Sequence, residues 1–342
     1  MSKKKLILLS YVFSPSIGGI ETVSLLVARS LAQRGFQVTV LTRTPSNGPE
    51  PDEPFRVLRS KSVWQLVREL FRADLVLQSH FSLKMGWPLW LLFPFKPFLL
   101  VMHGQVQQTS GRLLLRDRFK RLLLSRARLY SVSAEMARRI HPHCQVLHNP
   151  YDAEVFRRQE SGTRESDLLF VGRLVKAKGC EVLLRAMPQI LAARPQTRLA
   201  IVGSGKEEDA LRRQASALGL QEKVSFLGSM RGEALAGIMN QHKVLAVPSI
   251  SQPPEICPVV PIEAMACGCV PVASLCGGMA DSVGPGGLLV EEGNPHMLAT
   301  EILRLLESEP LRRQLQEKAQ EHLRKYHPTS VAMAYETALL TK

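Results

Sequence analysis

The sequence predicts an α/β protein with two doubly wound domains, each built on a parallel sheet with helices on both faces. With 342 residues, of which 45% are hydrophobic and 22% charged, the chain is globular and too long for one ordinary core. Short apolar segments rich in β-formers alternate with helical patterns along both halves. Between Tyr151 and Glu165 the sequence turns polar and loses its periodicity. We expect a first domain of residues 1–155, a second of residues 156–324, and a helix of about residues 325–342 that packs back on the first.

In the first half, six segments are predicted as strands, and Gly35 marks the end of the first helix. The segments are KLILLSYVF, FQVTVLT, DLVLQSH, FLLVMH, RLYSVS and CQVLHNP. The most apolar run, residues 86–102, contains three prolines and Lys96 and is shorter than the roughly 20 residues that a membrane span needs. It predicts a buried helix, a turn and a strand that can contact a membrane without crossing it.

The second half repeats the alternation and supplies five further strands. They are DLLFVG, RLAIVG, VSFLG, KVLAVPS and CVPVAS, with helical patterns between most of them and long helical sequence from Pro295 to Leu340. Open parallel sheets bind ligands beyond the carboxyl ends of their strands. Two such domains in tandem therefore predict a cleft lined by strand ends.

The net charge of +14 lies entirely in the first half, where residues 1–150 hold 22 Lys/Arg and 8 Asp/Glu. Residues 151–342 hold 22 of each. This asymmetry predicts an anionic surface or substrate for the first half alone. Residues 111–128 are the most basic stretch, interpreted either as a solvated helix or as a membrane contact. No aromatic stacking platform accompanies the charge, so nucleic acid is not expected as a partner.

The cysteines and the amino terminus indicate a cytoplasmic protein. None of the six cysteines forms a Cys-x-x-Cys pair, so they are interpreted as reduced thiols rather than as zinc ligands. The basic and apolar start resembles a signal peptide, but a first strand explains it better because no cleavage pattern follows.

Glycines and histidines mark strand ends in the first half. Gly18 and Gly19 follow the first strand and open a helix, which suits close approach of a phosphate or a simple tight turn. His80 and His103 each end a strand, and a histidine there can hydrogen-bond a substrate. We favour a structural role for His80 and a substrate contact for His103, which a glycine follows.

Arg173 and Lys178 follow the first strand of the second half and are five positions apart. A forked guanidinium and a compact ammonium at one strand end can converge on a diphosphate, although a solvated basic loop is the alternative. Gly203 and Gly205 form a glycine turn after the next strand, either to line a ligand cleft or as a structural turn.

Two glutamates, Glu255 and Glu263, frame a short apolar run. Glutamate is rarely buried without a partner, so the pair suggests a ligand whose hydroxyl groups the carboxylates accept. A helix is predicted to begin near Ile262, and Val259 and Val260 offer backbone amides to an anion, whereas Pro261 has none. No Asp-x-Asp occurs, so a metal-bridged diphosphate is not indicated and no metal or cofactor is expected.

Seven motifs occur in the order seen in retaining glycosyltransferases of family 4, which have the GT-B fold. The motifs are SIGGIE, VMHG, VGRLVKAKG, IVGSG, VSFLG, VPS and EICPVVPIEAMACG followed by PVAS. The chain resembles this family over nearly its whole length. The resemblance implies transfer of a sugar from a nucleotide sugar, such as a UDP- or GDP-sugar, to a polysaccharide, lipopolysaccharide or lipid-linked acceptor. It also implies a location at the cytoplasmic side, with peripheral contact to an anionic membrane.

The resemblance also implies a role for each matching position. Arg173 and Lys178 would hold the donor diphosphate, Glu255 the sugar hydroxyls and Glu263 the ribose. The other matching positions would line the donor site: Gly18, Gly19, His103, Gly203, Gly205, the backbone near Met230, Val259 and Val260.

Two departures from the family pattern affect the predicted sugar pocket. Ile256 stands where the family usually has glycine, and Pro261 removes an amide. The donor sugar is therefore not inherited from the family. Two other functions stay open: a GT-B-type binding or regulatory protein without catalysis, and an isomerase or dehydrogenase on paired doubly wound domains, although no dinucleotide-binding glycine motif is present.

Overall fold

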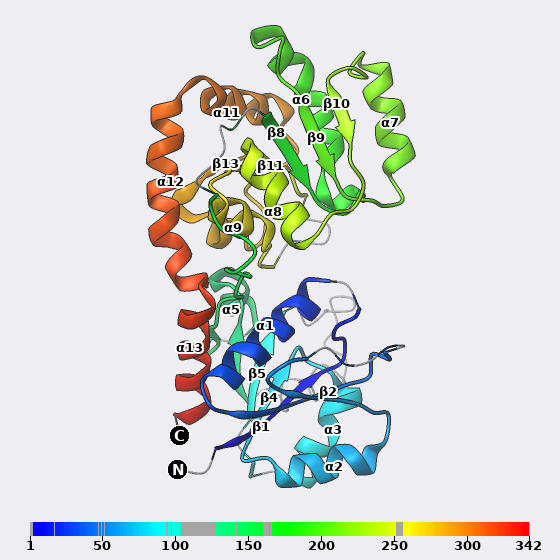
Figure 1. Ribbon diagram of the computed structural model, residues 1–342, viewed down its shortest axis with the longest axis vertical. Helices are drawn as coiled ribbons and strands as arrows, with labels where there is room; N and C mark the ends of the chain where they lie inside the picture. Colours follow the sequence, from blue (N-terminus) through cyan, green and yellow to red (C-terminus); the bar gives the residue numbers. More distant parts are fainter. Residues whose placement is uncertain are drawn as a thin grey trace. The chain divides into compact units, whose positions relative to one another are not determined.

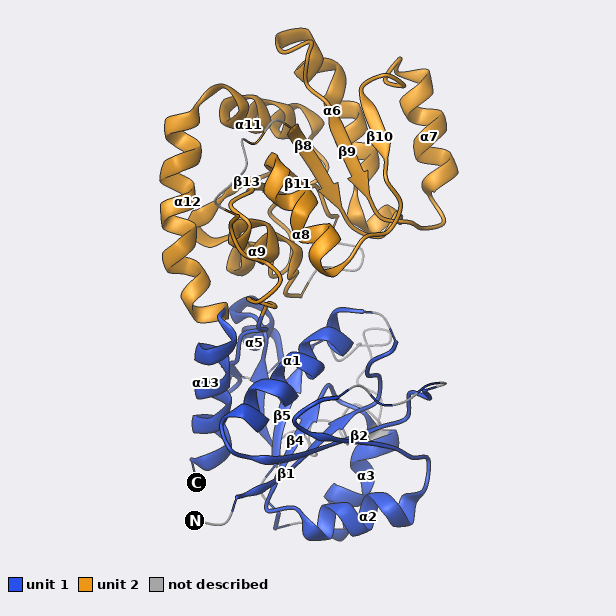
Figure 2. Cartoon of the chain, in the orientation of Figure 1, with its two compact units in different colours: residues 1–150, 327–342 blue, residues 151–326 orange. Residues whose placement is uncertain are grey.

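A computed structural model describes most of the chain in two compact units. It describes residues 3–16, 18–46, 48, 50, 52–93, 95–96, 98–103, 127–140, 142–159, 164, 166–250 and 256–341. Unit 1 contains residues 1–150 and 327–342, and unit 2 contains residues 151–326 (Figure 2).

Within its described residues, unit 1 has one parallel sheet with the strand order β3-β2-β1-β4-β5-β6-β7. The strands are β1 (Lys5–Ser10), β2 (Gln37–Thr42), β3 (Arg56–Arg59), β4 (Leu75–Ser79), β5 (Phe98–Met102), β6 (Arg128–Ser131) and β7 (Gln145–Val146). In the centre, Leu6 of β1 lies opposite Val38 of β2 and Leu75 of β4. The central strands are buried along nearly their full length, as a sheet covered on both faces requires.

The helices of unit 1 lie on the sheet in two groups (Figure 1). They are α1 (Gly19–Gln33), α2 (Val63–Arg72), α3 (Leu83–Leu92), α5 (Ala134–Ile140) and α13 (Pro328–Leu340). Helices α2 and α3 bury Leu70 and Trp90 in one cluster with Ile7 and Leu9 of β1. Because strand side chains alternate, Leu6 and Leu8 point to the opposite face. Helices α1 and α13 pack against each other and contribute no residue to that cluster.

Unit 2 has a second parallel sheet, with the order β10-β9-β8-β11-β12-β13 in its described part. The strands are β8 (Ser166–Val171), β9 (Leu199–Val202), β10 (Val224–Phe226), β11 (His242–Val247), β12 (Val270–Ser274) and β13 (Leu288–Val290). The helices are α6 (Cys180–Ala193), α7 (Glu208–Ala217), α8 (Gly232–Gln241), α9 (Val260–Ala266), α10 (Met279–Val283), α11 (Pro295–Glu307) and α12 (Glu309–Leu323). Helices α6, α7 and α11 contribute to one apolar cluster, and helices α8, α9 and α10 contribute to another. Helix α12 contributes to both.

The predicted fold class is confirmed, and two edge strands are additions to the prediction. Strand β3 has the sequence RVLR and β13 has LLV, so neither offers a long apolar run. Helix α9 begins at Val260, two residues before the predicted start, because proline is accepted in the first turn of a helix. All six cysteines are free thiols, as expected.

The prediction of a buried helix within residues 86–102 is wrong in part. In α3, Leu89 and Trp90 are buried, but Trp87, Leu91 and Leu92 are exposed. The helix is apolar on nearly every side, so its composition did not distinguish the face on the sheet from the face toward solvent.

Candidate active site

Each sheet has one point where the strand order reverses, and the predicted site residues follow strands around these points. In unit 2 the chain runs from β8 to β9 and β10, then returns on the other side of β8 as β11. In unit 1 the corresponding point lies between β1 and β4. Ligands of doubly wound sheets bind beyond the carboxyl ends of strands at such points.

The loop after β8 carries Arg173 and Lys178. Arg173 is exposed, and the half-buried Lys178 runs past Gly172, so that its Cγ and Cδ would lie 3.7 Å from a Cβ added there. Gly179 ends the loop with φ 64°, and a Cβ there would lie 1.8 Å from the carbonyl oxygen of Pro248, directly after β11. Only glycine permits this approach, which holds the end of the loop, next to Lys178, beside the end of β11.

The loop after β9 packs tightly on the loop after β8. Gly203 has φ 145°, and its Cβ would lie 1.8 Å from the carbonyl oxygen of Gly172. At Gly205 a Cβ would lie 2.3 Å from the carbonyl oxygen of Leu174. Close packing of backbone thus explains both glycines, and their predicted contact with a donor stays a prediction. After β10, Met230 is half-buried against the α8–α10 cluster.

Helix α9 begins beyond the end of β11 and presents Val259, Val260 and Glu263. Its first-turn amides have no acceptor within the helix, as at any helix start. Burial, and secondly the nearby Asp152 carboxylate, raises the pKa of the Glu263 carboxyl from 4.5 to about 7. Near neutral pH Glu263 therefore changes charge easily, which is unusual for a carboxyl group.

Glu255 lies in residues 251–255, outside the described residues. Its predicted place near the sugar hydroxyls stays a prediction. The two departures from the family pattern are both described: Ile256 is half-buried, and Pro261 is buried in the first turn of α9.

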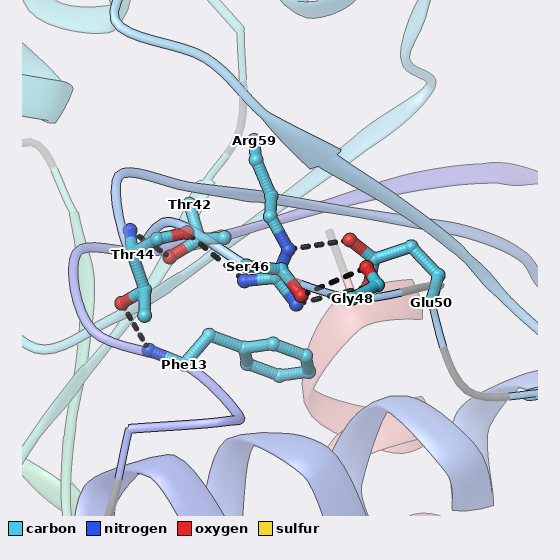
Figure 3. Close-up of polar contacts among 7 residues, drawn as sticks. All are labelled: Phe13, Thr42, Thr44, Ser46, Gly48, Glu50 and Arg59. Carbon is cyan, nitrogen blue, oxygen red and sulfur yellow. Dashed lines mark hydrogen bonds and ion pairs between the residues drawn. The ribbon is translucent and has the colours of Figure 1, made fainter.

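In unit 1 the loop after β1 is held by the connection between β2 and β3 (Figure 3). The backbone N–H of Phe13 donates to Thr44 Oγ1 at 2.9 Å. Arg59 donates to the Thr44 carbonyl at 2.9 Å and, in a forked pair at 2.5 and 2.9 Å, to the Glu50 carboxylate. The hydrogen bond from the Arg59 side chain lowers the pKa of the Glu50 carboxyl. These contacts fix the loop that leads to Gly18.

The described fold does not itself require glycine at Gly18 or Gly19. Gly18 has φ 172°, an extended conformation open to any residue, and an added Cβ would meet only the end of the Glu21 side chain. At Gly19 an added Cβ would have no atom within 4 Å.

His80 and His103 follow the neighbouring strands β4 and β5. His80 has φ 68°, which is rare for any residue other than glycine. Its backbone N–H donates to the Val101 carbonyl oxygen at 2.8 Å. Its buried Nδ1 has no hydrogen-bond partner among the described residues. Burial, and secondly the charge of His80, lowers the pKa of His103 to about 3, so His103 is neutral at physiological pH.

The structural role that the sequence favours for His80 stays a prediction. A strained backbone and an unsatisfied buried nitrogen are typical of functional sites. The sequence signal for His80 is its position at a strand end, in the same predicted domain as His103.

Two further findings concern the described residues as a whole. None of their helices is long and apolar enough to cross a membrane. Among their His, Cys, Asp and Glu side chains, no group of three or more is arranged to hold a metal ion.

Solved structures share this fold over nearly the whole chain. Anabaena Alr3699/HepE, solved with UDP and glucose, matches with a TM-score of 0.79 and 20% identity, covering 98% of this chain and 99% of that one. WaaG, a glycosyltransferase involved in lipopolysaccharide biosynthesis, matches with a TM-score of 0.70 and 17% identity, covering 98% and 100%. The fold is that of the GT-B glycosyltransferases, as predicted.

Family models place the chain more narrowly. The model described as Glycosyl transferases group 1 matches residues 152–322, half of the chain, and the model described as Glycosyltransferase Family 4 matches residues 17–155. The chain belongs to the glycosyl transferases group 1 family, which confirms the predicted family.

Curated relatives match over a part of their length. A GDP-mannose-dependent monoacylated alpha-(1-6)-phosphatidylinositol monomannoside mannosyltransferase of Corynebacterium glutamicum is 37% identical over 145 residues, 41% of this chain and 38% of that protein. A D-inositol 3-phosphate glycosyltransferase of Corynebacterium jeikeium is 36% identical over 166 residues, 46% of this chain and 39% of that protein. The matched segments thus span about two fifths of these relatives.

Proposed function

We propose that this protein transfers a sugar from a nucleoside diphosphate sugar to a hydroxyl group of a glycan or lipid-linked acceptor, with retention of anomeric configuration and without a metal ion. The observation that carries the proposal is the arrangement of unit 2 at its reversal point. Two cationic side chains follow β8, and a helix start with a carboxyl group of raised pKa follows β11. Family membership supports the reaction class.

Arg173 and Lys178 serve the diphosphate in this proposal. The forked guanidinium donates to phosphate oxygens, and the ammonium supplies a compact charge. Together they neutralise the negative charge that grows on the departing diphosphate, the role that a bound metal ion has in other transferases. The amides of Val259 and Val260 add donors at the start of α9.

The remaining residues hold the two ends of the donor. Glu263 accepts hydrogen bonds from the ribose hydroxyls, and Glu255 accepts them from the sugar. Backbone near Met230, Gly203 and Gly205 lies by the base in this proposal. In unit 1, Gly18 and Gly19 let the loop after β1 approach the phosphates, and neutral His103 exchanges a hydrogen bond with a sugar hydroxyl.

In the reaction, the bond between the sugar C1 and the diphosphate oxygen breaks, and a bond from C1 to the acceptor oxygen forms on the same face. The hydroxyl proton of the acceptor passes to the departing diphosphate. No side-chain nucleophile is required for this route.

The donor and the acceptor are proposed as classes. HepE was solved with UDP and with UDP-glucose, and the Corynebacterium glutamicum relative is named as GDP-mannose-dependent, so UDP- and GDP-sugars are the donors to test first. The same relative is named for a phosphatidylinositol mannoside, and WaaG for lipopolysaccharide biosynthesis, which favours a lipid-linked or polysaccharide acceptor at the cytoplasmic face of a membrane.

The test compares Arg173→Ala and Lys178→Ala with Lys176→Ala, an exposed lysine of the same turn. Loss of one electrostatic contact to the leaving group lowers kcat by about 10²–10³. We expect this loss for the first two variants and wild-type turnover for Lys176→Ala, measured as release of nucleoside diphosphate. Normal turnover by both Arg173→Ala and Lys178→Ala would contradict the assignment.

A further inference from the structure

The outward faces of α2 and α3 gather exposed apolar side chains. Of the fifteen large hydrophobic residues that are exposed in the described part of the chain, seven lie within residues 63–95. Six of them form what we term the apolar patch: Trp64, Phe71, Trp87, Leu91, Leu92 and Phe95. The exposed fraction is 84% for Trp64, 78% for Phe71 and 97% for Phe95. Such a concentration marks an interaction surface rather than scattered surface residues.

Helical spacing explains why α2 presents apolar groups on two sides. Leu66 and Leu70 are buried on the sheet, whereas Trp64 and Phe71, seven positions apart, lie together on the outward face. Ordinary surface helices place polar residues there. The outward pair therefore has no role in the core of unit 1.

Helix α3 continues the patch beside α2. Trp87 and Leu91, four positions apart, are exposed, and Leu89 between them is buried. The two helices pack against each other (Figure 1). Lys96 Nζ donates to the carbonyl oxygens of Leu70 and Ala73, which ties the turn carrying Phe95 to the end of α2. These contacts hold α2, α3 and the turn with Phe95 together in one part of unit 1.

The charges around the patch are positive. Residues 61–96 hold five Lys/Arg and two Asp/Glu. Arg68 and Arg72 are exposed on α2 beside the aromatic residues. Of the two acids, Glu69 is half-buried and Asp74 accepts the backbone N–H of Lys5 at 2.7 Å. Aromatic and aliphatic groups interspersed with arginine match the headgroup region of an anionic bilayer. A symmetric dimer through the patch would bring the same positive charge together from both copies, which disfavours that contact.

We propose that the apolar patch, with Arg68 and Arg72, docks on an anionic membrane and inserts its aromatic side chains at the level of the lipid headgroups. The docking itself does not depend on the donor, but its purpose rests on the proposed transfer to a lipid-linked acceptor. Helix α3 spans ten residues, about 15 Å, and starts three residues after His80 at the carboxyl end of β4. The helix therefore returns toward the start of β5, so Leu91, Leu92 and Phe95 lie toward the amino ends of the strands, whereas His80 lies at their carboxyl ends.

The test uses the full chain and intrinsic fluorescence, because all three tryptophans, Trp64, Trp87 and Trp90, lie in α2 and α3. Vesicles of phosphatidylglycerol are compared with vesicles of phosphatidylcholine. We expect a blue shift of the emission and co-sedimentation with phosphatidylglycerol, both weakening as salt rises. Absence of binding to phosphatidylglycerol at low salt would overturn the proposal.

Variants then test which residues make the contact with the membrane. Phe71→Glu/Leu91→Glu is expected to weaken vesicle binding at least about tenfold. Arg68→Gln/Arg72→Gln is expected to weaken it roughly 25-fold, because each basic residue contributes about fivefold. Met333→Glu is the matched control, since Met333 is 53% exposed on α13, which packs on α1. Equal vesicle binding by Phe71→Glu/Leu91→Glu and Met333→Glu would refute the role of the apolar patch in docking.

Two further measurements separate the outcomes. Nucleotide-sugar binding by thermal shift is expected to stay unchanged in all these variants, which shows that they fold. If no variant and no wild-type protein bound any nucleotide sugar while vesicle binding followed the pattern above, the proposed function would fail and the docking would stand. If Phe71→Glu/Leu91→Glu changed the molar mass in solution but kept vesicle binding, the patch would be a protein interface and the membrane proposal would be wrong.

Discussion

Replacing Glu263 with glutamine tests the charge state of the proposed ribose contact. The folded-state pKa of about 7 lies above the 4.5 of the unfolded chain. Between these values the folded protein keeps a proton that the unfolded chain has released, so the free energy of unfolding falls as pH rises from 4.5 to 7. Each pKa unit corresponds to about 1.4 kcal/mol, and for a half-buried group we expect a total effect of about 1–3 kcal/mol.

Glu263→Gln removes this effect. Compared with the wild type, the variant should gain about 1–3 kcal/mol of unfolding free energy between pH 4 and pH 8. Urea unfolding followed by far-ultraviolet circular dichroism measures the difference, since all three tryptophans lie in unit 1 and do not report on unit 2. Asp152→Asn keeps the oxygen that accepts the N–H groups of Glu154 and Val155, and should give a smaller change because burial is the larger cause. The reasoning is refuted if the unfolding free energies of the wild type and Glu263→Gln differ by the same amount at pH 4 and pH 8.

The same variant tests the binding role. A carboxylate accepts the hydrogen bonds of ribose hydroxyls, whereas a protonated carboxyl group accepts them less well. Donor binding by the wild type should therefore tighten up to about tenfold as pH rises from 6 to 8. Glu263→Gln should bind more weakly and show no such dependence by calorimetry.

Three further predictions concern glycine and histidine positions. Gly179→Ala should cost more than about 2 kcal/mol of unfolding free energy, since φ is 64° and the new Cβ would meet the Pro248 carbonyl oxygen. Gly219→Ala, with φ 70° and open space around the new Cβ, should cost about 1 kcal/mol. Equal costs of the two variants in urea unfolding would contradict this expectation. Gly19→Ala should leave stability unchanged or raised by up to about 1 kcal/mol while weakening nucleotide-sugar binding about tenfold or more, and unchanged binding in calorimetry would remove the residue from the site. His103→Gln should lower kcat roughly 10–100-fold with an unaltered pH profile, because the imidazole is neutral above pH 5; a His103 ring that titrates near pH 6.5 by NMR would oppose this.

The sequence predicted most of the fold because each central strand is an apolar run bounded by helical patterns. It did not predict β3 and β13, since edge strands of three or four residues need little apolar sequence. It also did not predict the exposure of Trp64 and Phe71. Hydrophobic patterns identify a face as apolar, but burial depends on whether another element covers that face.

At the candidate site, the sequence predicted residue types but not their environments. The raised pKa of Glu263 arises partly from Asp152, 111 positions earlier, which the fold brings near. The left-handed backbone of His80, and its Nδ1 without a partner in the described part of the chain, depend on how β4 ends beside β5. Such effects arise from tertiary contacts and leave no local pattern.

Glycine after a strand looks the same in both halves of the sequence, yet the structure separates two reasons for it. In unit 2, backbone of a neighbouring loop occupies the space of a Cβ at Gly179, Gly203 and Gly205, so glycine there builds the loops that carry Arg173 and Lys178. In unit 1, nothing in the described fold demands glycine at Gly19. The proposed function supplies a reason for that glycine, which is the close approach of a phosphate. Gly179→Ala should therefore reduce stability and donor binding together, whereas Gly19→Ala should reduce donor binding alone.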